Sequence, residues 1–198
     1  MEVTVVIGTF GDEQYRTWAT ERAAPSVPQG VPYIHHHGES LAQSRNAGLE
    51  LVNTEWVCFL DADDELTPGY FDAMNEGTAD LRAPAVEYTQ DGHTQSPYVP
   101  KVAGHRHACY GESSPSGNWL GIGTVARTEL VRSVGGFREF PVYEDWDLWL
   151  RCWLARGTVE AIPEAVYRAH VRNDSRNRGP SVKERNKVHH QIIESIYG

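Results

Sequence analysis

Three short apolar runs separated by longer amphipathic stretches dominate the first third of the chain. The runs cover residues 3–7, 31–35 and 55–60, and the first is rich in β-branched side chains. Short runs of this kind are typical of strands that are buried on both faces of a sheet. With helical stretches between them, the order strand, helix, strand, helix, strand predicts an α/β fold with a mixed, mostly parallel sheet flanked by helices.

Several helices have start or stop signals in the sequence. Ser40 followed by Gln43 has the spacing of a capping box, and Thr67 with Pro68 reads as an N-cap and first-turn pair. Gly135 and Gly136 are placed to end a short helix in the left-handed conformation. Further helices are expected at residues 12–24, 128–134, 145–155, where tryptophans recur at helical spacing, and from residue 183 onward.

Composition and charge narrow the class of protein. The 198 residues suffice for one domain with a real core, and 18 basic against 27 acidic residues give a net charge of −9. Duplex nucleic acid is therefore not an expected partner, because phosphate contacts need clustered basic residues. Cys58, Cys109 and Cys152 form no disulfide or zinc pattern. With no apolar stretch near the roughly 18 residues of a membrane span, we expect a cytoplasmic protein without a membrane span.

An acidic cluster follows the third apolar run. Asp61, Asp63 and Asp64 place three carboxylates within four residues, and like charges this close raise one another's pKa unless a cation or hydrogen-bond donors compensate. Hard cations such as Mg²⁺ and Mn²⁺ prefer oxygen ligands, so Asp61 and Asp63 are candidates for metal binding. For Asp64 and Glu65 we favour the alternative that they complement the dipole of the helix near Pro68.

Five segments, in order, resemble the family 2 glycosyltransferases, which have the GT-A fold. The acidic run is similar to the DxD strand end of that family. The other matches are the first strand at residues 5–10, the ARNxGL helix at 42–49, the GGF and EDxDLW segments at 134–137 and 143–149, and the closing strand at 163–170. The resemblance implies one GT-A domain at 1–170, with a nucleotide-sugar half (1–76) and an acceptor half (77–170), followed by a basic loop and amphipathic helix at 171–198.

The resemblance also implies a reaction and a donor site. The family transfers a sugar from a nucleotide diphosphate with inversion, and Mn²⁺ or Mg²⁺ assists the leaving group. By resemblance, Asp63 is the main metal ligand, Asp61 contacts the donor and reaches the ion, and His170 completes the metal site. A strand-end histidine with an ordinary structural role is the alternative for His170. The remaining donor-binding candidates are Gly8, Thr9, Phe10, Arg45 and Ala62, and a surface salt bridge is the alternative for Arg45.

Asp145 matches the general base of the family, with Glu144 beside it in the catalytic set. Direct displacement needs such a base near the acceptor hydroxyl, although both residues can instead cap the helix that follows them. Asp147 lies off the apolar stripe of that helix, so a surface or structural contact is expected. Trp119 and Trp146 are candidates for contact with the sugar or acceptor, and a core position is the alternative.

One departure from the family concerns the nucleotide. The usual Asp-Asp-Gly-Ser strand end is missing between Phe10 and Ser40, and the strand there ends in His35, His36 and His37. Neighbouring strand residues point to opposite faces, so one metal ion is not expected to use all three, and contact of one histidine with the nucleotide is the better hypothesis. A UDP-sugar is the expected donor.

Other functions remain open at this point. A nucleotidyltransferase shares the α/β frame and the metal carboxylates, but a basic residue is missing from the loop after the first strand. A non-catalytic module that binds a nucleotide sugar or carbohydrate is the alternative from a different class. The acceptor is a glycan, a lipid, a protein or a modified base. The locally basic residues around 172–187 form either a lid over the diphosphate or a solvated surface.

Overall fold

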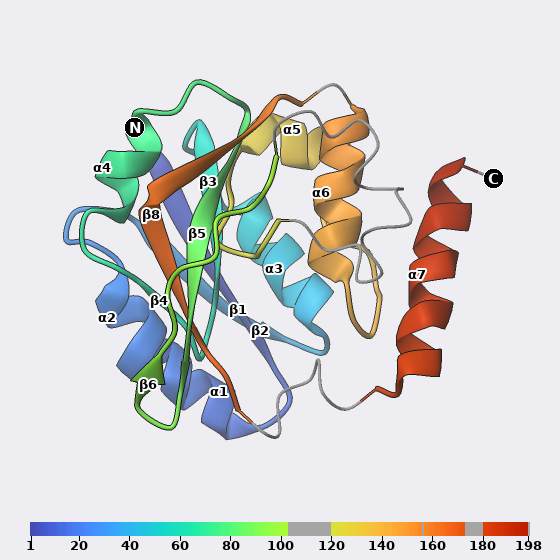
Figure 1. Ribbon diagram of the computed structural model, residues 1–198, viewed down its shortest axis with the longest axis horizontal. Helices are drawn as coiled ribbons and strands as arrows, with labels where there is room; N and C mark the ends of the chain where they lie inside the picture. The colour runs from blue at the N-terminus through green and yellow to red at the C-terminus, as the bar shows by residue number, and fades with distance from the viewer. Residues whose placement is uncertain (103–119, 156, 173–179, 198) are drawn as a thin grey trace.

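One mixed sheet forms the centre of the protein, seen in a computed structural model that describes residues 1–102, 120–155, 157–172 and 180–197 (Figure 1). The three apolar runs form the first three strands, which are neighbours in the sheet. The strands are β1 (Val3–Phe10), β2 (Tyr33–Gly38), β3 (Trp56–Asp61), β4 (Glu65–Leu66), β5 (Leu81–Gln90), β6 (His93–Thr94), β7 (Val125–Arg127) and β8 (Val159–His170). Their order across the sheet is β2-β1-β3-β7-β5-β8-β4, and β6 pairs with β5.

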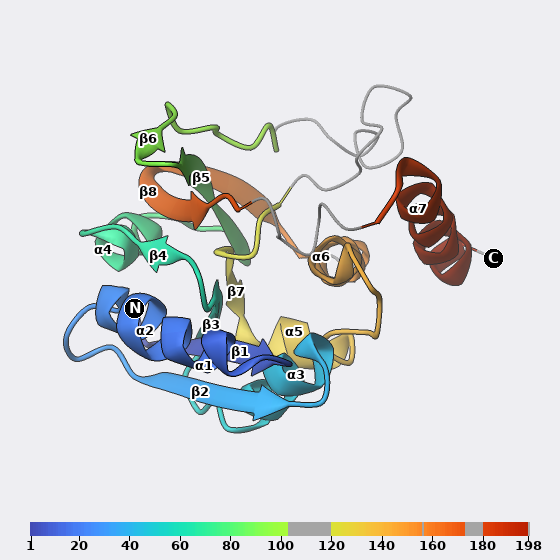
Figure 2. The ribbon, with the colours of Figure 1, turned by 90° about the horizontal axis from the view of Figure 1, so that it is seen from below.

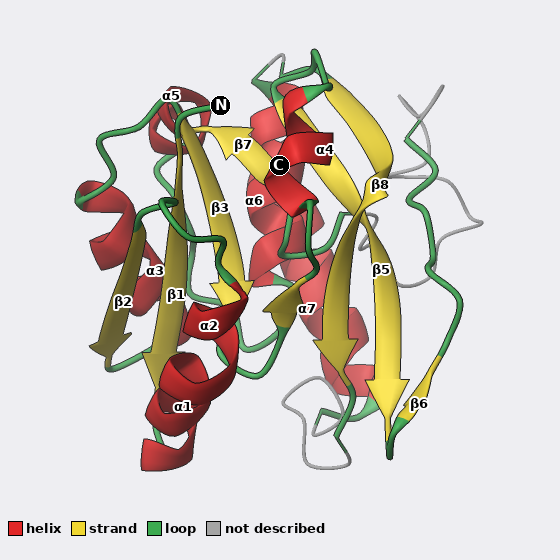
Figure 3. Cartoon of the chain, turned by 90° about the vertical axis from the view of Figure 1, so that its left-hand side faces the viewer, coloured by secondary structure: helices red, strands yellow, loops and turns green. Residues whose placement is uncertain are grey.

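The direction of the strands places the candidate site. β1 pairs in parallel with β2 and β3, β7 is antiparallel to both β3 and β5, and β5 is parallel to β8. The strands β1, β2, β3, β5 and β8 therefore all point the same way, and their carboxyl ends meet at one edge (Figure 3). Ligands of open α/β sheets bind at this edge. The predicted mixed, mostly parallel sheet is confirmed.

Helices cover both faces of the sheet. The segment α1 (Glu13–Trp18), a π-helical turn η1 (Ala19–Ala23) and α2 (Ala24–Ser26) cover one face of the first strands, whereas α3 (Leu41–Glu50) covers the other (Figures 1 and 3). The core lies between these layers. The remaining helices are α4 (Tyr70–Asn75), α5 (Thr128–Ser133), α6 (Glu144–Leu154) and α7 (Val182–Tyr197).

The C-terminal helix α7 packs beside α6, away from the central sheet (Figure 2). A second hydrophobic cluster fills this contact, and its buried members are Val142, Trp146, Leu150, Val188 and Ile192. Apolar side chains at helical spacing on both helices are thus removed from water, which is the main stabilising contribution to such a contact. In the described residues, none of the helices is both long and apolar enough to cross a membrane.

The start signals predicted for α3 and α4 had different outcomes. Ser40 caps α3 as predicted, because its hydroxyl accepts a hydrogen bond of 3.1 Å from the backbone N–H of Gln43. The prediction for Thr67 was wrong: α4 begins at Tyr70, after Gly69 with φ of +80°. Thr67 lies beside β8, and its hydroxyl donates to the Val166 carbonyl at 2.8 Å instead of capping the helix.

Candidate active site

The acidic run forms a tight turn at the end of β3. The backbone N–H of Asp64 donates to the carbonyl of Asp61 at 3.1 Å, which closes the turn over residues 61–64. Ala62 within it is buried in the main core. The turn therefore fixes the carboxylates of Asp61, Asp63 and Asp64 at the carboxyl edge of the sheet, each in a different direction and with different partners.

Asp61 is joined to the candidate catalytic segment through Arg45. Arg45 is 2% exposed, and its guanidinium lies 2.5 Å from Asp61 and 2.8 Å from Glu144 at the start of α6. Burial opposes the charge, but the carboxylates of Asp61 and Glu144 raise the pKa of Arg45 above its ordinary value. The alternative of a surface salt bridge is thus corrected: the ion pair exists, but it is buried at the site because α3 packs against β1.

Asp63 faces a different cation. Its carboxylate forms an ion pair with Arg172, just after β8, and its backbone carbonyl accepts a hydrogen bond of 2.9 Å from Arg22. Burial and the neighbouring Asp61 raise the pKa of Asp63, and Arg172 acts in the opposite direction. A basic side chain of the protein thus compensates one of the crowded carboxylates.

Asp64 and Glu65 bind β8 rather than the following helix, which corrects the prediction that they complement a helix dipole. The hydroxyl of Tyr167 and the backbone N–H of His170 each donate to Asp64 at 2.8 Å. Glu65 belongs to β4, and its carboxylate lies 2.6 Å from Nε2 of His170. Burial, with Asp63 and Asp61 nearby, raises the pKa of Asp64 well above its ordinary value. The strand β8 pairs with β4 here, so donors of β8 reach these carboxylates first.

The carboxylate oxygens of the acidic turn are suitable ligands for a hard divalent cation. The expected set of Asp61, Asp63 and His170 is, however, not brought together. Asp61 and Asp63 each use one carboxylate oxygen in their ion pair with an arginine, and their side chains are 33% and 21% exposed. The imidazole of His170 contacts Glu65 instead. Across the described residues, no three His, Cys, Asp or Glu side chains are grouped to hold a metal. Two carboxylates together with substrate phosphates are the usual Mg²⁺ arrangement.

A cavity of about 460 Å³ lies between the acidic turn and the start of α6. Asp61 and Arg45 line it from the donor half, and Asp145 lines it from the acceptor half. The other predicted donor residues, Gly8, Thr9, Phe10, Ala62 and Asp63, do not line this cavity. Its remaining lining residues are Asp64, Val86, Tyr88, Gly121, Ile122, Val142, Tyr143, Glu144, Tyr167, Ala169 and Arg185.

Asp145 is at the first turn of α6 and reaches the cavity. The N-cap of this helix is Tyr143, in the left-handed conformation with φ of 66°, and no side chain caps the helix there. The carboxylate of Asp145 accepts a hydrogen bond of 2.8 Å from the backbone N–H of Trp146. Neither Glu144 nor Asp145 is the N-cap itself. Glu144 binds Arg45, whereas Asp145 accepts a hydrogen bond from the first turn, as the capping alternative allowed, and also lines the cavity.

The two tryptophan candidates for the acceptor have separate outcomes. Trp146 is fully buried, and its ring stacks on His189 of α7 with centroids 4.8 Å apart. Its side chain therefore belongs to the contact between α6 and α7, which corrects the prediction that it contacts the sugar or acceptor. Trp119 lies outside the described residues, as does Cys109.

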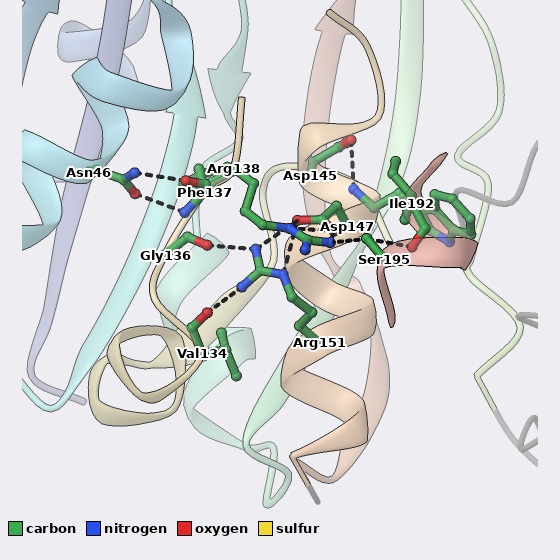
Figure 4. Close-up of polar contacts among 11 residues, drawn as sticks. Asn46, Val134, Gly136, Phe137, Arg138, Asp145, Asp147, Arg151, Ile192 and Ser195 are labelled. Atoms are coloured by element: carbon green, nitrogen blue, oxygen red, sulfur yellow. Dashed lines mark hydrogen bonds and ion pairs between the residues drawn. The ribbon is translucent and has the colours of Figure 1, made fainter. Parts of the chain in front are cut away.

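For Asp147, a surface or structural contact was expected. The structure shows a structural contact, because Asp147 is fully buried. Arg138 and Arg151 both form ion pairs with its carboxylate (Figure 4). Arg151 also donates to the carbonyl oxygens of Val134 and Gly136 at 2.5 and 2.6 Å. The network holds the glycine-containing loop against α6 and so supports the segment that carries Asp145.

The end of β1 meets the histidines of β2. The hydroxyl of Thr9 lies 3.0 Å from Nε2 of His35 and 3.1 Å from Nδ1 of His37. His35 and His37 thus share one side of the strand, as alternation predicts, and His36 has a buried ring nitrogen, Nδ1, without a hydrogen-bond partner. Thr9 is 1% exposed and serves this contact. Whether a histidine contacts a nucleotide stays a prediction.

Several residues of the cavity were missed at the level of sequence. Tyr88 comes from β5, which lies outside the segments that were predicted to form strands. Tyr167 contacts two residues of the acidic turn, Asp61 through its backbone N–H and Asp64 through its carboxylate. In the register of β5 and β8, Tyr88 lies opposite Ala169 and Tyr167 lies opposite Val86. This register depends on contacts that are distant in sequence. Alternating apolar residues in 81–88 were the available signal for β5.

The comparisons with known proteins agree with this architecture. The family model for glycosyl transferase family 2 matches residues 12–109. The structure is similar to S. aureus TarS 1-349 in complex with UDP-GlcNAc, with a TM-score of 0.71, 16% identity, and coverage of 99% of this chain and 66% of that one. The complex of TarS 1-349 with UDP gives a TM-score of 0.65 at 16% identity, with coverage of 99% and 65%. No curated protein sequence matches the chain.

The fold is that of the GT-A glycosyltransferases. The chain contains a glycosyl transferase family 2 domain. It spans slightly less than two thirds of TarS 1-349, and 40% of a longer TarS chain.

Proposed function

We propose that the chain transfers a sugar from a nucleotide-diphosphate donor to an acceptor hydroxyl, with inversion at the anomeric carbon. The observation that carries the proposal is the shared cavity, in which Asp61 from the end of β3 faces the same space as Asp145 from α6. A donor-side carboxylate and a base that line the same cavity are what a direct displacement requires. A UDP-sugar is the proposed donor, since UDP-GlcNAc and UDP are the ligands in the TarS complexes.

In the proposed reaction, Asp145 accepts the proton of the acceptor hydroxyl as its oxygen attacks the anomeric carbon. The bond between that carbon and the diphosphate oxygen breaks, and the nucleoside diphosphate leaves with both bonding electrons. Asp61 and Asp63 would hold Mn²⁺ or Mg²⁺ together with diphosphate oxygens, and the ion supplies positive charge that stabilises the leaving group. Arg45 orients Asp61 and Glu144 through its two ion pairs.

The first test is binding. A panel of nucleotide sugars is added to the chain with and without Mn²⁺, and the thermal unfolding midpoint is measured. A donor present at 100 times its Kd adds about 2.7 kcal/mol to the free energy of unfolding, and the largest shift is expected for a UDP-sugar with Mn²⁺. If no nucleotide sugar shifts the midpoint in either condition, the proposed donor site is wrong.

The second test is turnover. UDP release from UDP-GlcNAc, with water or an added acceptor receiving the sugar, is compared between the wild type and Asp145→Asn. Loss of a general base lowers the rate by about 10²–10⁴-fold, whereas the metal-dependent thermal shift is expected to persist. Loss of that shift as well contradicts the role of Asp145 as a base, and binding without any turnover in the wild type indicates a binding module. The anomeric configuration of the product, measured by NMR, tests inversion.

A further inference from the structure

Arg172 is held by two different kinds of contact at the acidic turn. Its guanidinium is paired with the carboxylate of Asp63. The same group lies over the ring of Trp18, 4.0 Å from the ring centroid, and 5.9 Å from that of Tyr15. Arg172 follows β8, whereas the two aromatic residues belong to α1. Trp18 and Asp63 thus hold the guanidinium of Arg172 together.

The two aromatic side chains that support Arg172 also contact each other. The rings of Tyr15 and Trp18 meet edge to face, with centroids 5.4 Å apart and an interplanar angle of 89°. The Arg172 and Asp63 side chains are 20% and 21% exposed. An arginine that stacks on an aromatic face and pairs with a carboxylate loses less freedom per contact than an isolated surface pair.

A cation at Asp63 matters because this carboxylate is the proposed metal ligand. A guanidinium and a divalent ion both supply positive charge to the same carboxylate, and both need to approach its oxygens. Mg²⁺ and Mn²⁺ bind carboxylate oxygens at close range and carry tightly held waters. The two cations therefore compete, and the free energy of the ion pair between Arg172 and Asp63 opposes metal binding.

We propose that Arg172 is the resident counter-ion of Asp63 and sets the metal affinity of the site, because a divalent cation binds only by displacing its guanidinium. This inference rests on the proposed function for its metal. Displacement leaves the aromatic contacts of Arg172 with Trp18 intact, so the arginine stays beside the site while its carboxylate partner changes. The chain thereby compensates the charge of Asp63 when no metal is bound.

The test is the binding of Mn²⁺ alone to the full chain, followed by the loss of the free-ion signal in electron paramagnetic resonance. Arg172→Gln is expected to bind Mn²⁺ about five- to tenfold more tightly than the wild type, the amount expected from losing a partly buried ion pair supported by a cation–π contact. Arg168→Gln is the matched control: it removes the same charge from β8, but the Arg168 guanidinium contacts Glu87. This control is expected to stay within about twofold of the wild type.

A second pair of variants shows whether the gain acts through Asp63. In an Asp63→Asn background, Arg172→Gln is expected to give no gain in Mn²⁺ affinity. Circular dichroism and thermal melts check that each variant is folded. If Arg172→Gln does not fold, Arg172→Lys replaces it, with an expected gain of about two- to threefold, because lysine keeps the charge but loses the planar stacking.

The outcomes separate this inference from the proposed function. An Arg172→Gln affinity equal to or weaker than that of the wild type, a similar gain in Arg168→Gln, or a gain that persists without Asp63 overturns it. It is also overturned if neither the wild type nor Arg172→Gln binds Mn²⁺. A wild type that binds Mn²⁺ through Asp63 but never turns over a nucleotide sugar contradicts the proposed reaction and leaves the role of Arg172 standing.

Discussion

The side-chain amide of Asn46 and the backbone of Phe137 exchange two hydrogen bonds, each 2.8 Å long. Asn46 lies on α3, and Phe137 follows the two glycines that end α5. The preceding residue of the helix, Arg45, binds Asp61 and Glu144. Two consecutive residues of α3 thus fix the acidic turn, the start of α6 and the loop before it.

Replacement of Asn46 by alanine is expected to lower the free energy of unfolding by about 1–3 kcal/mol, because a buried N–H and a buried carbonyl of Phe137 lose their partner. Urea unfolding followed by circular dichroism measures the change. Asn53→Ala is a matched control, since within the described part of the chain the side chain of Asn53 makes an exposed local bond to Leu51. It is expected to stay within about 0.5 kcal/mol of the wild type. Equal effects of the two substitutions would contradict the assigned role of Asn46.

Gly8 provides the space in which Arg45 lies. A Cβ atom at Gly8 would come within 2.8 Å of Cγ and 3.2 Å of the backbone nitrogen of Arg45. Gly8→Ala is therefore expected to cost about 1–3 kcal/mol of stability through overpacking. At Gly121 the closest atom to a Cβ among the described residues is 3.6 Å away, on Val86, so Gly121→Ala is expected to be tolerated. Thermal or urea unfolding of both variants distinguishes a specific clash from a general intolerance of alanine.

The sequence was most informative where the chemistry is local. The strands β1 and β3 have dense apolar runs, Ser40 has its capping partner three residues away, and Cys58 and Cys152 are buried as their apolar neighbours indicate. Burial raises the pKa of Cys152 to about 12, so this thiol is unreactive. Such features depend on neighbours within a few residues, which a single sequence contains.

The partners of the acidic residues could not be predicted in the same way. Asp64 was assigned to the following helix, but it binds β8, more than 100 residues later in the chain. Arg45 was expected to line the donor pocket, and its second partner, Glu144, is 99 residues away. These contacts depend on the order and register of the strands and on helix packing. A pattern of neighbouring residues in the sequence does not predict them.

The histidines of β2 give the protein a predicted pH dependence. Burial, followed by the charges of His37, Arg16 and His36, lowers the pKa of His35 below 6.5. The unfolded chain therefore binds a proton at His35 more readily than the folded chain. This contribution to stability is complete above about pH 6.5 and is lost as the pH falls toward the lowered pKa of the folded state.

Unfolding free energies measured between pH 8 and pH 5 check this. The wild type is expected to lose stability below about pH 6.5 more steeply than His35→Gln, which has no titrating group at this position. His190→Gln is a suitable control, because it removes a histidine from α7, far along the chain. Identical slopes for the wild type and His35→Gln would show that the neutral imidazole of His35 is not required by the fold.

The final prediction concerns the buried ion pairs of Arg45. Arg45→Met removes the cation between two carboxylates and is expected to cost about 3–5 kcal/mol, because a buried charge is left uncompensated. Glu144 is only 4% exposed at its side chain, whereas Asp61 is 33% exposed and can be hydrated. Most of the cost is therefore expected to come from Glu144.

A double-mutant cycle tests this division. Glu144→Gln in the Arg45→Met background removes the buried charge, so the double variant is expected to be more stable than Arg45→Met alone by about 1–3 kcal/mol. Asp61→Asn in the same background is expected to recover less, because water already compensates part of that charge. Urea unfolding of all the variants gives the coupling energies. Losses that simply add for Arg45 and Glu144 would mean that the guanidinium does not hold the start of α6, and that Asp145 owes its position to the Asp147 network instead.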